Sequence, residues 1–216
     1  MSVRSLAVTL GFVALTTLST LSAEAQVGRA VTVLEANTAT ESQLAALPHM
    51  TVGLAKELIA ARPFLSATAF DAFLAPTLSK DQRTELYPTL FVHIDLNSAT
   101  REEIQLVPGI GPRMTREFLE YRPYRGIAVF RREMGKYVNE TEVARLEQYV
   151  FVPMDINTAT DEELNTIPGF GPRMLREFKE YRPFRNVEQF RREIGKYVNA
   201  REVARLERYI FVPVQP

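Results

Sequence analysis

Apolar positions recur along most of the chain at helical spacing, and they predict short amphipathic helices. Between residues 113 and 121, for example, Met114 and Phe118 are four residues apart and share one face of a helix. This helix is expected to end before Arg122-Pro123, because a residue that precedes proline disfavours helical backbone angles. Two more helices are predicted to follow, from about Val129 to a break at Gly135 and over Glu142–Tyr149. Since no segment has the clear alternation of a strand, the pattern predicts an all-α fold.

The same pattern returns every 60 residues. Its fixed points are an asparagine, an arginine followed by proline, and a Phe-Val pair, at Asn37, Asn97 and Asn157, at Arg62, Arg122 and Arg182, and at Phe91, Phe151 and Phe211. The chain beyond residue 30 therefore divides into a first unit at 31–90, a second unit at 91–150 and a third unit at 151–212. The second and third units agree at 38 of 58 positions when Asp95–Val152 is set against Asp155–Val212. Because such short units bury little apolar surface, we expect them to pack against one another.

Each unit opens its first helix with a capping box, in which a hydroxyl and a residue three positions on satisfy backbone N–H groups. The boxes are at Thr40–Gln43, Thr100–Glu103 and Thr160–Glu163. In the second and third units this helix leads to a Pro-Gly-x-Gly-Pro hairpin, at 108–112 and 168–172. Two glycines around one apolar residue allow a tight reversal with positive φ, and the final proline suits the first turn of the next helix.

The two glycine hairpins are candidate anion-binding sites. Consecutive backbone N–H groups at the start of a helix attract an anion, and glycine lets a phosphate approach the backbone closely. The candidate site residues are Gly109, Ile110, Gly111, Arg113 and Arg116 in the second unit and Gly169, Phe170, Gly171, Arg173 and Arg176 in the third. Arginines at a helix start are unfavourable by roughly a few tenths of a kcal/mol unless an anion binds there.

A purely structural interpretation of these hairpins stays open. The glycines can simply turn the chain, and each arginine can pair with a glutamate four residues further on. The pairs would be Arg113–Glu117, Arg116–Glu120, Arg173–Glu177 and Arg176–Glu180. Exposed pairs of this kind contribute little, and arginine before glutamate is the weaker order, so we favour anion binding.

The other basic and aromatic residues of the second and third units have structural interpretations. The arginine pairs Arg131-Arg132 and Arg191-Arg192 lie among acids and are expected on exposed helix faces. Lys136 and Lys196 are expected in solvent, with contact to a phosphate as the less favoured alternative. The tyrosines, among them Tyr121, Tyr137 and Tyr149, are predicted to lie in the core and not to stack on nucleic-acid bases.

The order of four motifs resembles the ComEA-like helix-hairpin-helix family of competence proteins. These motifs are Asn-x-Ala-Thr, Glu-Glu, Pro-Gly-x-Gly-Pro and Tyr-Arg-Pro. The resemblance covers 97–152 and 157–212 well, and 37–92 in outline. It implies sequence-independent binding of double-stranded DNA, in which hairpin amides and a nearby basic residue hold the phosphate backbone, and a role in DNA uptake. The family's second hairpin departs from Gly-x-Gly in this chain, which has Gly135-Lys136 and Gly195-Lys196 at those positions.

The first unit breaks the hairpin pattern. Its hairpin is Pro48-His49-Met50-Thr51-Val52, so both glycines are replaced, and Gly53 stands where the others have arginine. Between residues 31 and 90 the chain carries four basic and six acidic residues. We therefore expect the first unit to bind no phosphate and to serve as a packing unit or as the contact for a protein partner.

The first 25 residues are typical of an export signal. Arg4 supplies the positive start, Leu6–Leu21 is largely apolar, and Ala23-Glu24-Ala25 has the form of a cleavage site. An uncleaved membrane anchor fits less well, because hydroxyl residues interrupt a stretch that is already short for a span. We expect a signal peptide at residues 1–25, cleavage after Ala25, and a periplasmic or secreted protein.

Composition narrows the classes of function. The chain has no cysteine and only two histidines, His49 and His93, which lie far apart. With 26 basic and 26 acidic residues, it has no bulk positive charge to attract nucleic acid. We expect a non-enzymatic protein without cofactor, metal or small-molecule substrate, whose partner is double-stranded DNA. The alternative is a structural or protein-interaction module of the same fold that does not bind DNA.

Overall fold

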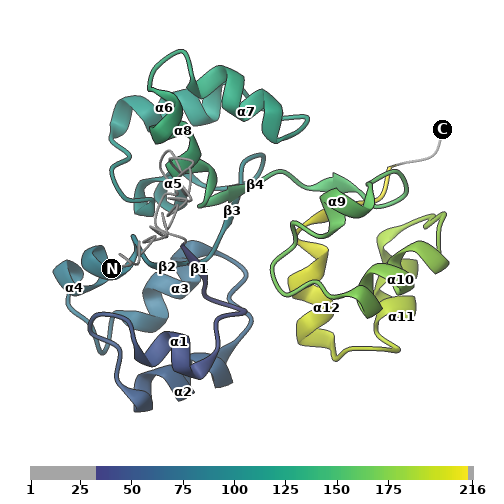
Figure 1. Ribbon diagram of the computed structural model, residues 1–216, viewed down its shortest axis with the longest axis horizontal. Coiled ribbons are helices and arrows are strands. Elements are labelled where there is room, and N and C mark those ends of the chain that lie inside the picture. Colours follow the sequence, from purple (N-terminus) through teal and green to yellow (C-terminus); the bar gives the residue numbers. More distant parts are fainter. Residues whose placement is uncertain (1–32, 214–216) are drawn as a thin grey trace, which may run out of the picture.

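The structure, a computed structural model, describes residues 33–213, and the chain in this range is mostly α-helical (Figure 1). One order of elements, a strand, four helices and a second strand, occurs three times. The signal peptide expected at residues 1–25 lies outside the described residues. Between residues 33 and 213, none of the helices is long and apolar enough to cross a membrane.

The elements of each unit are short. In the first unit they are β1 (Leu34–Glu35), α1 (Glu41–Ala45), α2 (Val52–Ala61), α3 (Ala67–Leu74), α4 (Lys80–Leu86) and β2 (Leu90–Phe91). In the second unit they are β3 (Ile94–Asp95), α5 (Arg101–Leu106), α6 (Pro112–Glu120), α7 (Ile127–Met134), α8 (Glu140–Glu147) and β4 (Val150–Phe151). In the third unit they are β5 (Met154–Asp155), α9 (Asp161–Leu164), α10 (Pro172–Glu180), α11 (Val187–Ile194), α12 (Ala200–Glu207) and β6 (Ile210–Phe211).

The strands were not predicted. In each unit the first and last strands pair in parallel, so that the start of the unit is tied to its end; the partners are Leu34 with Leu90, Ile94 with Val150 and Met154 with Ile210. A strand of two residues is too short to show alternation in the sequence, and for that reason the pattern missed it. The first ladder also reaches Phe91, one residue beyond the unit boundary that the sequence suggested.

The predicted helix ends agree with the structure where a capping residue marks them. The three capping boxes form as expected, at Thr40, Thr100 and Thr160. Helix α6 ends at Glu120, before the Arg-Pro pair. Helix α8 begins at Glu140, two residues earlier than predicted, because the side chain of Asn139 accepts a hydrogen bond from the backbone N–H of Glu142.

The repeated asparagine and arginine hold each unit together. In the second unit, Oδ1 of Asn97 accepts from the N–H of Tyr124 at 2.7 Å, and its Nδ2 donates to the carbonyl of Tyr124 at 2.9 Å. Arg122 donates through Nε to the carbonyl of Leu96 and through a terminal nitrogen to that of Ala99. Asn37 and Asn157 make the same pair of bonds in their units. These invariant positions therefore serve the fold.

We expect Asn97→Ala to lower the free energy of unfolding by about 2–3 kcal/mol, because it leaves two backbone groups of the buried Tyr124 without partners. The matched control is Asn165→Ala, since Asn165 is exposed at the end of α9 and its loss should cost less than about 0.5 kcal/mol. Urea unfolding of both variants measures the difference. Equal losses would show that the asparagine bridge does not stabilise the unit.

The first two units share one apolar core, and the third has its own. The shared core runs from Val33 to Val150, and within it the rings of Phe91 and Tyr149 pack edge to face at 5.3 Å. The core of the third unit runs from Ile156 to Ile210. Figure 1 shows the third unit beside the other two, with the chain crossing to it after β4. The first two units therefore pack against each other, as expected, and their contact is apolar.

Candidate nucleic-acid interface

The hairpin between the first two helices has the same turn in all three units. It is closed by a backbone hydrogen bond from Ile110 to Val107 at 3.1 Å in the second unit, and from Phe170 to Ile167 at 3.0 Å in the third. The first glycine has positive φ, 77° at Gly109 and 72° at Gly169, as predicted. In the first unit His49 adopts a φ of 62° at this position. Histidine is among the side chains that enter this region more readily than most.

The second glycine of each hairpin departs from the expectation. Its φ is −92° at Gly111 and −111° at Gly171, values that any residue adopts. A Cβ atom built on either glycine would meet no other atom within 4 Å. Neither backbone conformation nor packing within the described residues therefore requires glycine at these two positions. Because Gly111 and Gly171 have no side chain, open space remains at the start of α6 and of α10.

The first unit shows what a side chain does at this position. Thr51 has nearly the same backbone as Gly111, with φ −92° and ψ 159° against φ −92° and ψ 176°. Its hydroxyl accepts a hydrogen bond from the N–H of Leu54 at 3.1 Å and so caps α2. Helices α6 and α10 have glycine as the N-cap residue and therefore no side-chain cap. Their first N–H groups are thus left for an acceptor from outside the helix.

The four candidate arginines are exposed beside these helix starts, at Arg113, Arg116, Arg173 and Arg176. Within residues 33–213, none of the four predicted pairs with a glutamate four residues on is an ion pair. Arg116 instead lies 3.7 Å from the carboxylate of its neighbour Glu117, and Arg176 lies 3.3 Å from that of Glu177. Both arginine side chains are about two-thirds exposed, although the glutamates beside them are buried. The arginines therefore stay accessible to an anion.

A pair of tyrosines links the glycine hairpin to the second turn of the unit, a feature that the sequence interpretation missed. The hydroxyls of Tyr121 and Tyr137 are 2.8 Å apart and their rings are half-buried, whereas Tyr149 lies in the core as predicted. The guanidinium of Arg113 lies 5.7 Å from the ring centre of Tyr137, and Nζ of Lys136 lies 5.0 Å from that of Tyr121. Two cations from different turns thus flank the same tyrosine pair.

The third unit repeats this arrangement. Arg173 lies 5.5 Å from the ring of Tyr197, and Lys196 lies 5.0 Å from the ring of Tyr181. The two lysines are exposed, but each also pairs with a glutamate of its own turn, Glu133 or Glu193, so they are not simply solvated. The spacing of 16 residues between the two tyrosines, present in both units, is the signal in the sequence that could have pointed to the pair.

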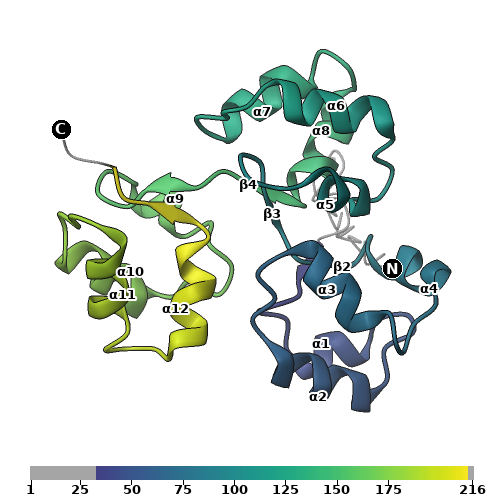
Figure 2. The ribbon, with the colours of Figure 1, turned by 180° about the vertical axis from the view of Figure 1, so that it is seen from behind.

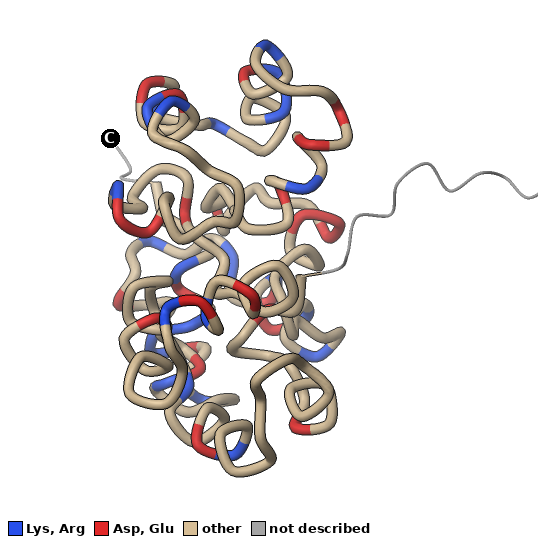
Figure 3. The backbone as a smooth tube through the Cα atoms, turned by 90° about the vertical axis from the view of Figure 1, so that its left-hand side faces the viewer, with Lys and Arg blue, Asp and Glu red and all other residues tan. Residues whose placement is uncertain are grey.

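The hydroxyl of Tyr137 carries no charge at neutral pH. Hydrogen bonds with Tyr121 and with the carboxylate of Glu117 raise the pKa of the Tyr137 hydroxyl. Figure 3 shows Lys and Arg residues interspersed with Asp and Glu residues along the described part of the backbone. Near the second hairpin, the cations available to a ligand include the exposed Arg113 and Arg116.

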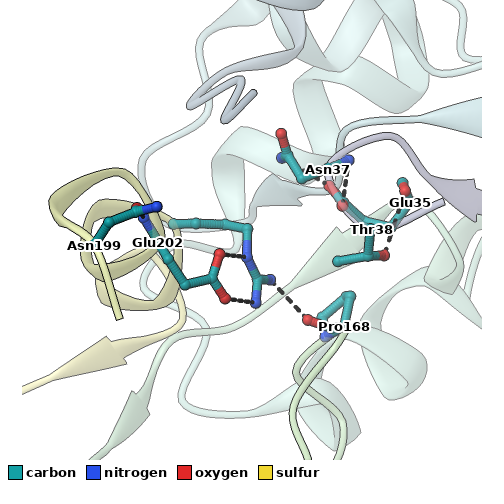
Figure 4. Close-up of polar contacts among 7 residues, drawn as sticks. Glu35, Asn37, Thr38, Pro168, Asn199 and Glu202 are labelled. Atoms are coloured by element: carbon teal, nitrogen blue, oxygen red, sulfur yellow. Dashed lines mark hydrogen bonds and ion pairs between the residues drawn. The ribbon is translucent and has the colours of Figure 1, made fainter. Parts of the chain in front are cut away.

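The second and third hairpins differ in what lies beside them. A Cβ atom on Gly109 would meet Arg145 of the same unit, at 3.1 Å. A Cβ atom on Gly169 would lie 3.0 Å from the methyl carbon of Thr38, which belongs to the first unit. Figure 4 shows Thr38 facing Pro168 of this hairpin. The third hairpin is thus in contact with the first unit through a residue far away in the sequence.

The chemistry of the interface follows from the chain's own geometry. Comparisons with the models of known protein families, with curated proteins and with solved structures found no match.

Across residues 33–213, no group of three or more histidine, aspartate or glutamate side chains is placed to hold a metal ion. The arrangement offers uncapped helix N–H groups, open space above a glycine, and exposed arginine and lysine side chains. Together these groups can bind an anion such as a phosphate.

Proposed function

We propose that the protein is a non-enzymatic, exported protein that binds double-stranded DNA through its phosphate backbone, without sequence preference. The observation that carries this proposal is the second glycine of each hairpin. Gly111 has an ordinary φ and no neighbour that excludes a side chain, yet it leaves the start of α6 uncapped. Close approach by a phosphate explains such a glycine, because a side chain would fill the space that the phosphate needs.

The surrounding charges suit a phosphate backbone better than a single small anion. Arg113 and Arg116 are exposed on α6, and Lys136 lies across the tyrosine pair from Arg113. Side chains at three places can contact successive phosphates, and such contacts position DNA without reading its bases. The order of elements within each unit fits three tandem helix-hairpin-helix units. Together with the resemblance to ComEA-like proteins and the expected signal peptide, this supports DNA uptake in the periplasm or outside the cell.

The alternative function is that of a protein-interaction module. A specific observation favours this alternative, but only for the first unit. There Thr51 caps α2 internally, and Val52 and Leu65 are about half exposed. A hairpin whose N–H groups are already satisfied has little to offer a phosphate. We propose that this unit contributes packing and protein contacts, and that DNA binding belongs to the other two.

The salt dependence of DNA binding tests the proposed function. Two arginines at one hairpin predict that log K falls with log salt at a slope of about −2, whereas both hairpins on one duplex predict about −4. The measurement is fluorescence anisotropy with a short duplex of mixed sequence, repeated with two unrelated sequences as the control for specificity. Binding that ignores salt, or that strongly prefers one sequence, would contradict backbone contact.

A further inference from the structure

Successive units contact each other through one repeated aromatic pair. The closing strand of each unit ends at a phenylalanine, and the parallel ladder holds it in the same register every time. Phe91, at the end of β2, packs against Tyr149 of the second unit with 5.3 Å between the ring centres. Phe151, at the end of β4, packs against Tyr209 of the third unit at 4.3 Å. Each of these phenylalanines therefore meets a tyrosine that follows the fourth helix of the next unit.

The side chain just before each tyrosine completes the contact. Oε1 of Gln148 accepts a hydrogen bond from the N–H of Val33, at 3.0 Å. At the same place in the third unit, Arg208 donates to the carbonyl of His93 at 2.6 Å. The guanidinium of Arg208 also lies 5.3 Å from the centre of the Phe151 ring. The accepting surface thus consists of a tyrosine ring and one hydrogen-bonding side chain beside it.

The corresponding phenylalanine of the third unit is uncovered. Phe91 is fully buried and Phe151 is half-buried, whereas Phe211 is 49% exposed. Within residues 33–213, no other phenylalanine is exposed. Figures 1 and 2 show that β6, the yellow strand that ends at Phe211, leads to the side of the third unit turned away from the other two. The surface by which the second unit contacts the third is therefore open on the third unit itself.

The first unit lacks the accepting surface. At the two positions where the second and third units have Gln148-Tyr149 and Arg208-Tyr209, the first unit has Pro88-Thr89. Outer units of repeat proteins usually present a polar face, and the first unit follows this rule, whereas the third presents Phe211. Both accepting tyrosines are only 2% exposed, because the preceding phenylalanines cover them. A second copy of this chain therefore offers Phe211 no free tyrosine.

The residue at the start of the third unit narrows the choice of partner further. Val33, His93 and Pro153 hold equivalent positions, 60 residues apart. Because Pro153 has no N–H, it cannot make the bond that Val33 donates to Gln148. Its carbonyl can accept a hydrogen bond, as the carbonyl of His93 does from Arg208. The matching side chain on a partner is therefore a donor such as arginine.

We propose that the surface around Phe211 is a docking site for another protein, which presents a tyrosine ring and a preceding arginine at the end of a helix. The two contacts of this kind within the chain show what covers such a phenylalanine. In the complex, the tyrosine packs on Phe211 and the arginine donates to the carbonyl of Pro153. The inference goes beyond the proposed function, since it assigns a protein partner to the third unit and leaves the glycine hairpins as the proposed DNA sites.

The test builds the partner's surface on a second chain. An acceptor variant carries Pro88→Arg and Thr89→Tyr, so that its first unit has the residues of the third unit at these places, and Phe211→Ser, so that it cannot bind itself. Because Pro88 is exposed and Thr89 half-buried just after α4, the variant should fold. Sedimentation of a dye-labelled acceptor variant with the parent should show a complex of the two. Phe211→Ser in the parent should weaken this complex by about tenfold or more, because it removes the central aromatic ring.

Each side of the complex has a matched control. On the parent, Val52→Ser removes another half-exposed apolar side chain, far from β6 in the sequence, and should leave the complex unchanged. On the acceptor, a variant with Phe211→Ser alone keeps Pro88 and Thr89 and should not bind the parent. The parent by itself should sediment as a monomer, because its first unit has no accepting tyrosine.

Stability gives a second measurement, which does not depend on the acceptor variant. Phe151→Ser removes a ring that packs on Tyr209 and should lower the midpoint of urea unfolding. Phe211→Ser should lower that midpoint much less, because half of this residue is already exposed. Equal losses would show that Phe211 is covered within its own chain, and they would overturn the docking site.

Three further results would also overturn the proposal. A folded acceptor variant that does not bind the parent would show that a tyrosine and an arginine are not what Phe211 accepts. Association of the parent with itself, lost in Phe211→Ser, would make a second copy the occupant. A loss of affinity for duplex DNA in Phe211→Ser would assign the surface to DNA. A complex that needs both Phe211 and the two changes at Pro88 and Thr89 supports the docking site, whether or not the protein binds DNA.

Discussion

Reversing both charges at the second hairpin, with Arg113→Glu and Arg116→Glu, should lower affinity for duplex DNA by roughly 100-fold and reduce the salt slope by about 2. Each change removes a cation and adds repulsion beside the phosphate. The same change in the third unit, Arg173→Glu with Arg176→Glu, should weaken binding to a similar degree, because these two arginines are equally exposed beside their hairpin. Anisotropy titrations at two salt concentrations measure both effects.

The two double variants control for each other, since they alter net charge equally and lie at equivalent positions of nearly identical helices. All four arginines are exposed, so both variants should fold and differ little from the parent in thermal unfolding. The expected losses are the contact of Arg113 or Arg173 with a tyrosine ring, worth about 0.5–1 kcal/mol, and the ion pair of Arg116 or Arg176 with the neighbouring glutamate. If both variants bind DNA like the parent, the hairpins serve only to turn the chain, and the protein-interaction alternative is favoured.

Gly111→Thr should move stability and DNA binding in opposite directions. The backbone at Gly111 matches that of Thr51, and a Cβ atom there meets nothing within 4 Å, so threonine fits. Its hydroxyl should cap α6 and reduce the freedom of the unfolded chain, which raises the free energy of unfolding by about 0.5–1 kcal/mol. The same hydroxyl takes the N–H group that a phosphate would use. DNA affinity should therefore fall by about tenfold or more.

Two matched variants sharpen this experiment. Gly171→Thr makes the same change in the third hairpin, where a Cβ atom also meets nothing within 4 Å, and it should give a similar gain in stability and a similar loss of DNA affinity. Thr51→Ala removes the natural cap from α2 and should cost about 1 kcal/mol of stability while leaving DNA binding unchanged. Urea unfolding and anisotropy report the two quantities separately. A Gly111→Thr protein that binds DNA like the parent would mean that no phosphate approaches this glycine.

Some of the site was predictable because it depends on neighbours within one helical turn. The capping threonines, the positive φ of Gly109 and Gly169, and the end of α6 before Arg122-Pro123 all follow from local rules. The extended φ of Gly111 was not foreseen, because the two glycines on either side of Ile110 look alike to such rules although only Gly109 needs positive φ. The comparison with Thr51, which the repeat makes possible, is what reveals the difference.

By itself the sequence determined three similar units, their helix starts and the turn of each hairpin, since these features depend on contacts between residues close along the chain. Only the tertiary structure decided that the second and third hairpins differ. The two units agree at 38 of 58 positions, so their own residues cannot predict unlike surroundings. The difference comes from Thr38 beside Gly169 and from the bond of Arg201 to Ala60 across 141 residues. Contacts over such separations are set by how whole units pack, and no local pattern encodes them.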